Sequence, residues 1–206
     1  VLRRAGMAGL LAAGLAACGG GPRAPEFPGA AAYGIEIVVR TPANFRTPAD
    51  VGRFVEQAAR HGVGTISLLV KQDEDGTIPS GAVYYRSTVA PGAQGYAGFD
   101  VLQTMLEAAH ARGLRVQAWI PQFHDQVAAR ANPAWQMRTL KNGAIVPYTG
   151  ARQTEYFVNP LDPAVQAYQL AIVREVVTRY AVDGVMLDWI RFDDYPMDLG
   201  DVTRAQ

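Results

Sequence analysis

The sequence lacks the features that mark several common classes of protein. Its 206 residues include one cysteine, Cys18, so no disulfide can form within the chain. Nineteen basic residues balance nineteen acidic ones, so net charge attracts neither nucleic acid nor acidic membranes. No uninterrupted run of about 18 apolar residues occurs, which disfavours a membrane-spanning helix. No His-x-His pair or other metal-ligand spacing is present, and we expect neither a metal nor a cofactor.

Residues 1–18 have the pattern of an export signal. Arg3 and Arg4 precede an uncharged apolar stretch, residues 5–17, which is too short to span a bilayer. The stretch ends in Leu15-Ala16-Ala17-Cys18, where small residues before the cysteine let an extended backbone enter a signal peptidase. This quartet resembles the bacterial lipobox, which implies a lipid on Cys18 and removal of everything before it.

Two plainer interpretations compete with the lipobox. Residues 5–17 could form a buried helix beside a chance cysteine, or a secretory signal without a lipid. The lipobox is favoured because the cysteine lies at the expected position and residues 19–32 form a flexible Gly/Pro/Ala tether. We therefore expect an exported protein, anchored through Cys18 to the outer or plasma membrane on its periplasmic or extracellular side. The remaining residues, 33–206, form the domain behind the anchor.

This domain alternates between strand-like and helix-like segments. A helix signal, an N-cap residue before an apolar 3.6-residue period, begins at Thr47, Asp100 and Asp162. Two of these helices are expected to end at Gly62 and Gly113. Short β-branched runs predict the strands, at residues 34–40, 65–70, 114–120 and 182–188. Such alternation implies an α/β fold with a parallel sheet covered by helices.

Two loops are much longer than such a fold requires. Residues 71–99 and 121–161 each follow a predicted strand, so both lie at the C-terminal edge of the sheet, where active sites form. Long ordered loops there are more often functional than not. A flavodoxin-like sheet is the structural alternative. It needs a glycine-rich phosphate loop after the first strand, and residues 41–45, Thr-Pro-Ala-Asn-Phe, do not supply one.

Several segments of this domain match one known family in order and spacing. They are residues 99–102, 107–119, 132–135, 141–143, 159–165 and, most strongly, 180–192. Together they resemble the glycosyl-hydrolase-like family 10 barrels, which are distinct from the family 10 xylanases. Residues 71–76 with 84–87 are also similar to a sister group of glycoside hydrolases, which stays an alternative.

The resemblance implies a (β/α)8 TIM barrel, typically of about 250 residues or more. The sequence contains four recognisable strands, so we expect about the first four β/α units, with residues 33–206 as the N-terminal half of the barrel. A half barrel leaves its last strand unpaired. We therefore expect this chain alone to be inactive and to melt broadly or without a cooperative transition.

Asp188 is the best candidate for a catalytic residue, because it follows an apolar run at the C-terminal end of a strand. Glycoside cleavage needs two carboxylates, one to protonate the leaving oxygen and one to stabilise or attack the anomeric carbon. Arg191 could hold a carboxylate ionised or bind a sugar hydroxyl. Alternatively, Asp188 is a helix cap or part of a loop ion pair. Asp193 and Asp194 could reach the site, but the second acid could equally lie outside this chain.

Other strand ends carry residues that could bind substrate. Trp119 offers a flat apolar face for a sugar ring, although it could instead point into the core. Gln122 and His124 can form hydrogen bonds with sugar hydroxyls. Substrate ligands or rim ion pairs are also possible roles for Arg40, Lys71 and Asp73, and Tyr85 could form an aromatic wall or simply pack the loop.

The leading hypothesis is an envelope-anchored glycoside hydrolase that cleaves a polysaccharide with a carboxylate pair including Asp188. The substrate suggested by the anchor and the resemblance is a peptidoglycan glycan or an exopolysaccharide. The alternative is a catalytically inactive, sugar-binding lipoprotein. Partners other than the polysaccharide and the membrane are not indicated, and the oligomeric state is left open.

Overall fold

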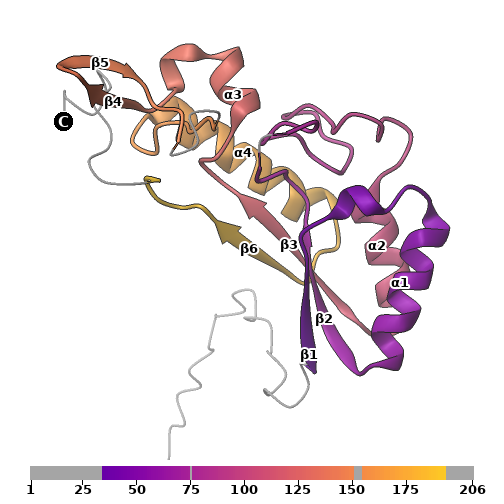
Figure 1. Ribbon diagram of the computed structural model, residues 1–206. Coiled ribbons are helices and arrows are strands. Elements are labelled where there is room, and N and C mark those ends of the chain that lie inside the picture. Colours follow the sequence, from indigo (N-terminus) through magenta and orange to yellow (C-terminus); the bar gives the residue numbers. More distant parts are fainter. Residues whose placement is uncertain (1–33, 75, 151–154, 194–206) are drawn as a thin grey trace, which may run out of the picture.

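The computed structural model describes residues 34–74, 76–150 and 155–193. These residues form an α/β fold with a four-stranded parallel sheet in the order β1-β2-β3-β6 (Figure 1). Its strands are β1 (Ile35–Val39), β2 (Val63–Leu69), β3 (Arg115–Pro121) and β6 (Gly184–Asp188). The predicted signal peptide, the tether, Cys18 and Asp194 lie outside the described residues.

Three helices connect the strands and pack on one side of the sheet (Figure 1). They are α1 (Pro48–Arg60), α2 (Val101–His110) and α4 (Pro163–Arg179). Each begins at the predicted N-cap: Thr47, Asp100 and Asp162 accept hydrogen bonds from backbone N–H groups of their first turns. No helix in the described part of the chain combines the length and apolar character needed to cross a bilayer.

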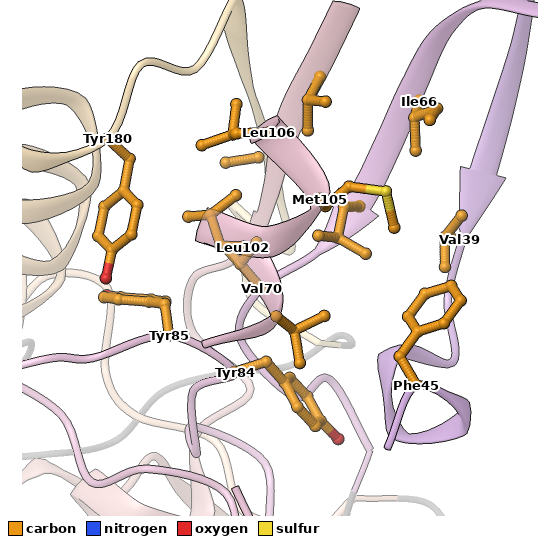
Figure 2. Packing of buried hydrophobic residues seen from close by; sticks show 14 of the residues in the cluster. Val39, Phe45, Ile66, Val70, Tyr84, Tyr85, Leu102, Met105, Leu106 and Tyr180 are labelled. Atoms are coloured by element: carbon orange, nitrogen blue, oxygen red, sulfur yellow. The ribbon is translucent and has the colours of Figure 1, made fainter. Parts of the chain in front are cut away.

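The core lies between the sheet and these helices. Side chains alternate along each strand, so Ile66, Leu68 and Val70 all point to the helix side and are fully buried. Figure 2 shows Val70 and Ile66 beside the apolar face of α2, which presents Leu102 and Met105. The opposite face of the sheet carries most of the polar side chains discussed below.

The order of the strands decides between the two predicted architectures. Each strand lies beside the strand that precedes it in this sheet, with the register Leu69–Trp119–Met186 across β2, β3 and β6. A flavodoxin-like sheet reverses its strand order and carries helices on both faces. The strand order therefore contradicts the flavodoxin-like alternative, and the described residues form an α/β fold with consecutive parallel strands.

The long loop after β3 contains structure that the sequence analysis missed. It includes a short helix α3 (Gln126–Ala131), a 3-10 helix (Pro133–Trp135) and a hairpin of β4 (Arg138–Lys141) and β5 (Ala144–Pro147). The hairpin projects from the arrowhead end of the sheet (Figure 1). Its turn residues, Asn142 and Gly143, both have positive φ, 52° and 79°. An Asn-Gly pair is the strongest short hairpin signal and could have revealed this element.

Candidate active site

Asp188 ends β6 at the C-terminal edge of the sheet, and both of its carboxylate oxygens are held by N–H groups. The register sets Asp188 beside Pro121, so Trp119 lies one strand away on the same face. The indole N–H of Trp119 donates to Oδ2 at 3.1 Å, and the backbone N–H of Trp189 donates to Oδ1 at 2.7 Å. Asp188 is therefore oriented by N–H groups of its own chain, and no helix begins in the described residues that follow it, 189–193.

Trp189, the next residue, was not predicted as part of the site. Its backbone lies in the left-handed region with φ of 53°, a conformation that costs about 1–3 kcal/mol for a non-glycine residue and clusters at functional sites. Its ring centroid lies 5.7 Å from that of His124 and 5.8 Å from that of Phe157. The Arg191 guanidinium carbon lies 4.5 Å from the ring centroid. These three contacts hold the strained residue, which is itself half-buried.

Arg40 and Asp73 form the neighbouring part of the site. The Arg40 guanidinium lies 2.9 Å from Asp73 and 2.7 Å from Glu74 and remains about half exposed. It also lies 6.0 Å from the ring centroid of Trp119, which connects this ion pair to Asp188. Burial raises the pKa of Asp73, and the charge of Arg40 offsets this only in part.

A pocket of about 770 Å³ opens beside Arg40, within the size range of ligand sites. Most of its walls come from the segments that follow β1 and β2. Its principal polar lining consists of Arg40, Arg46, Gln72, Asp73, Glu74 and the ring of Tyr84. Sugar hydroxyls need such a mixture of donors and acceptors. Arg46 and Gln72 were missed, because nothing in their local sequence separates them from ordinary loop residues.

The structure buries Lys71 in an ion pair, which favours the ion pair over a substrate ligand among its two predicted roles. Its ammonium group pairs with Asp125 at 2.8 Å, and neither side chain has any exposed surface. It also donates to the carbonyl oxygens of Pro121 at 2.8 Å and Gln122 at 3.0 Å, and to Gln169 Oε1 at 3.1 Å. Burial lowers the pKa of Lys71, while the charge of Asp125 opposes that change. Lys71 is a structural residue that joins the two long loops.

Tyr85 is also outside the site. Its ring meets Tyr180 edge to face at 5.5 Å, within the core between the helices (Figure 2). Of its two predicted roles, the burial of Tyr85 favours packing of the loop over an aromatic wall. Gln122 and His124 do lie near Asp188, but both are buried: the Gln122 amide donates to the Ile120 carbonyl at 2.9 Å, and the His124 ring stacks on Phe157. These placements favour structural roles.

The segment after β6 folds onto itself. Arg191 donates to the carbonyl oxygens of Phe192 at 3.0 Å and Asp193 at 2.8 Å, and not to Asp188. Arg191 therefore pairs with the carboxylate of Asp193 and not with Asp188, whose two oxygens accept hydrogen bonds from the N–H groups of Trp119 and Trp189. Asp193 accepts a hydrogen bond from the Tyr148 hydroxyl at 2.5 Å, which ties this segment to the base of the hairpin.

No group of three or more His, Cys, Asp or Glu side chains that could hold a metal ion occurs among the described residues, 34–74, 76–150 and 155–193. The chemistry that the site offers there is carried by carboxylates, guanidinium groups, amides and indole rings.

Solved structures share this fold. A hypothetical protein from Ruminiclostridium thermocellum ATCC 27405 superposes with a TM-score of 0.61 at 18% identity, and the match covers 80% of each chain. Alpha-L-fucosidase isoenzyme 2 from Paenibacillus thiaminolyticus superposes with a TM-score of 0.56 at 21% identity, over 74% of this chain and 23% of that one. The chain is thus an α/β protein whose structural neighbours include glycosidases with TIM-barrel-type folds.

Sequence comparison assigns the family. Residues 41–201 match the family Glycosyl hydrolase-like 10, so the chain belongs to that family and the predicted resemblance is confirmed. The glycosyl hydrolase DigH of Escherichia coli (strain K12) is 30% identical over 167 residues, which are 74% of this chain and 37% of that protein. The chain therefore spans little more than a third of the length of this relative.

Proposed function

We propose that the chain is the N-terminal part of the catalytic barrel of a glycoside hydrolase that cleaves a polysaccharide. The observation that carries the proposal is the position of Asp188. It is the one carboxylate among the described residues that ends a strand of the parallel sheet, where barrels present catalytic groups. Membership of a glycosyl hydrolase-like family makes a glycosidic bond the natural target.

The surroundings of Asp188 support a polysaccharide as the ligand. The half-exposed guanidinium of Arg40 lines the polar pocket and lies 6.0 Å from the ring centroid of the buried Trp119, which bonds Asp188. Convergent hydrogen-bonding groups in a pocket are what sugar recognition requires. A lipid on Cys18 would hold this surface near the cell envelope. A peptidoglycan glycan or an exopolysaccharide is therefore the proposed substrate.

The apolar outer edge of the sheet supports a larger barrel. Among the described residues, β6 has one neighbouring strand, and its Val185 and Leu187 side chains are partly exposed on the helix side. On α4, Leu170 and Val177 are likewise exposed. A further β/α unit beside β6 would bury all four side chains and would bring another strand end toward Asp188. The second carboxylate of the pair is expected from such a strand.

The test compares the full-length protein with its Asp188→Asn variant on purified glycan strands. Removal of an essential carboxylate should lower the release of reducing ends by about a hundredfold or more, without lowering the melting temperature. Asp183→Asn is the matched control, because Asp183 lies at the opposite end of β6 and pairs with His110. It should retain activity. Equal release by Asp188→Asn and the unaltered protein would refute the proposed role.

The second candidate function is a sugar-binding lipoprotein without catalysis. The observation in its favour is that, within the described residues, no second carboxylate ends a strand of this sheet. The same experiment separates the two functions. Binding of glycan strands with no cleavage by either the unaltered protein or the variant would establish the sugar-binding function.

A further inference from the structure

We infer that Trp119 is a positioning residue that holds Asp188 as a carboxylate in the proposed cleavage. Asp188 then gives an electron pair either to the anomeric carbon or to a proton of the attacking water, while the glycosidic C–O bond breaks and the leaving oxygen takes its proton from the other carboxyl group. This inference rests on the proposed function and assigns the role of one member of its carboxylate pair. It also implies that the proton donor is the other member, from a different strand end.

The inference starts from the nature of the two donors. An indole N–H and a backbone N–H can only donate, so each bonds an oxygen that acts as an acceptor. Trp119 occupies Oδ2 at 3.1 Å and Trp189 occupies Oδ1 at 2.7 Å. A protonated carboxyl would have to place its hydrogen on one of these two oxygens. A carboxylate satisfies both donors and keeps lone pairs on each oxygen for substrate or water.

The position of Trp119 is fixed by its neighbours. The ring is 7% exposed and belongs to the central strand β3, whose register with β6 sets it next to Met186. The Arg40 guanidinium carbon lies 6.0 Å from the ring centroid. Because the indole is part of a hydrogen-bonded strand, its N–H is presented to Asp188 before any substrate arrives.

The charged groups around this edge are all engaged with partners other than Asp188. Arg40 pairs with Asp73 and Glu74, and Lys71 pairs with Asp125. Arg191 pairs with Asp193 and with backbone carbonyls, and His124 stacks on Phe157. Within the described residues, no cationic side chain forms an ion pair with Asp188. The two N–H groups are therefore its direct stabilising contacts in this part of the chain.

The test is the pH profile of kcat/KM for the Trp119→Phe variant of the full-length protein. Phenylalanine keeps an aromatic ring but lacks the N–H donor, so the carboxylate form of Asp188 loses stabilisation. We expect kcat/KM to fall by about tenfold on the acidic side of the profile, with the alkaline limb unchanged. Trp135→Phe is the matched control, since that indole packs on Tyr168, and its profile should not move.

Two results would overturn the inference. An upward shift of the alkaline limb in Trp119→Phe would make Asp188 the proton donor. Unchanged limbs in an active Trp119→Phe would mean that the indole does not position the carboxylate. If Asp188→Asn itself retains activity, it is the proposed function that fails. The hydrogen bond between Trp119 and Asp188 is then tested by a measurement that does not need enzyme activity.

That measurement is the indole ¹⁵N–¹H signal of Trp119 in full-length protein labelled on tryptophan, assigned by its absence in Trp119→Phe. Because the N–H bonds the carboxylate, the signal should shift as Asp188 is protonated, and the shift should vanish in Asp188→Asn. The Trp135 signal serves as the internal control. A Trp119 signal that ignores pH, or one that titrates equally in Asp188→Asn, would overturn the inference.

Discussion

Two charged clusters lie at the same edge of the sheet and differ in almost every physical respect. Lys71 and Asp125 have no exposed surface, and the ammonium group has four acceptors around it. Arg40 is 53% exposed, and it connects Asp73 to Trp119. Arg40 and Lys71 both follow a strand, so position after a strand does not by itself distinguish a structural ion pair from a ligand site.

The buried cluster of Lys71 and Asp125 has a structural role. Asp125 caps α3 through the Ala128 N–H at 2.8 Å and also accepts from Gln169 of α4 at 3.0 Å. Gly81 of the first long loop approaches so closely that a Cβ there would lie 2.0 Å from Asp125 Oδ1, and its φ is +90°. Glycine is therefore required at this position. The cluster therefore holds both long loops against α4.

The largest expected effect comes from Lys71→Met in the full-length protein. It leaves the buried Asp125 carboxylate unpaired, so we expect a loss of about 3–5 kcal/mol in the free energy of unfolding, measured with urea. Arg40→Met, at the exposed pair, should cost no more than about 1 kcal/mol. Adding Asp125→Asn to Lys71→Met keeps the cap of α3 and should restore much of the loss. If Lys71→Met and Arg40→Met lower the free energy of unfolding equally, the proposed difference between the buried and the exposed cluster is refuted.

An intermediate effect is expected at the outer edge of the sheet, which depends on what covers β6. Leu187 is 44% exposed in this chain. If a further β/α unit covers it, Leu187→Thr should destabilise the full-length protein by about 1.5 kcal/mol or more. The same substitution in the isolated chain, which we expect to melt broadly, should change its unfolding little. An equally small effect in both proteins would refute the proposed barrel.

The smallest effect concerns two carboxylates with opposite environments. Burial raises the pKa of Asp73 from 3.8, despite Arg40. Burial also acts on Glu175, but hydrogen bonds from Ser87 and Thr88 and the pairing with Arg179 hold its pKa below 4.5. The folded protein therefore binds more protons at Asp73 than the unfolded chain does, and it binds fewer at Glu175.

The two groups should thus have opposite signatures in unfolding experiments across the acidic range. The contribution of Asp73 to the free energy of unfolding is present below pH 3.8 and is lost as the pH rises through the pKa of Asp73 in the folded protein. The contribution of Glu175 to the free energy of unfolding is present above pH 4.5 and is lost as the pH falls through the pKa of Glu175 in the folded protein. Asp73→Asn should steepen the acid-side rise of stability with pH, and Glu175→Gln should flatten it. The same change of slope in both variants would contradict the assigned environments.

Much of the fold could be predicted because its signals are local. The caps at Thr47, Asp100 and Asp162 need only the next few residues of the chain, and the structure has helices beginning after each of them. The strands were also predictable, since each contains a short run of β-branched residues. The signal of the hairpin at Asn142-Gly143 is also local, so this element too could be predicted from the sequence.

The candidate site could be predicted only in part. Asp188 and Trp119 were identified because they end or lie near the end of a strand, and the structure joins them by a hydrogen bond across 69 positions of sequence. Lys71 was assigned to the same group, yet it is buried against Asp125. The left-handed backbone of Trp189 has no sequence signal, since tryptophan rarely adopts it.

The sequence by itself determined the elements, their order and the family, because period, capping and motif spacing are properties of neighbouring residues. Only the tertiary structure decided which side chains at the strand ends face solvent and which form a buried ion pair. Register between strands brings together residues far apart in the chain, and burial then separates chemically similar groups. Arg40 and Lys71 carry the same charge after adjacent strands, and packing alone leaves the first exposed beside Trp119 and encloses the second with Asp125.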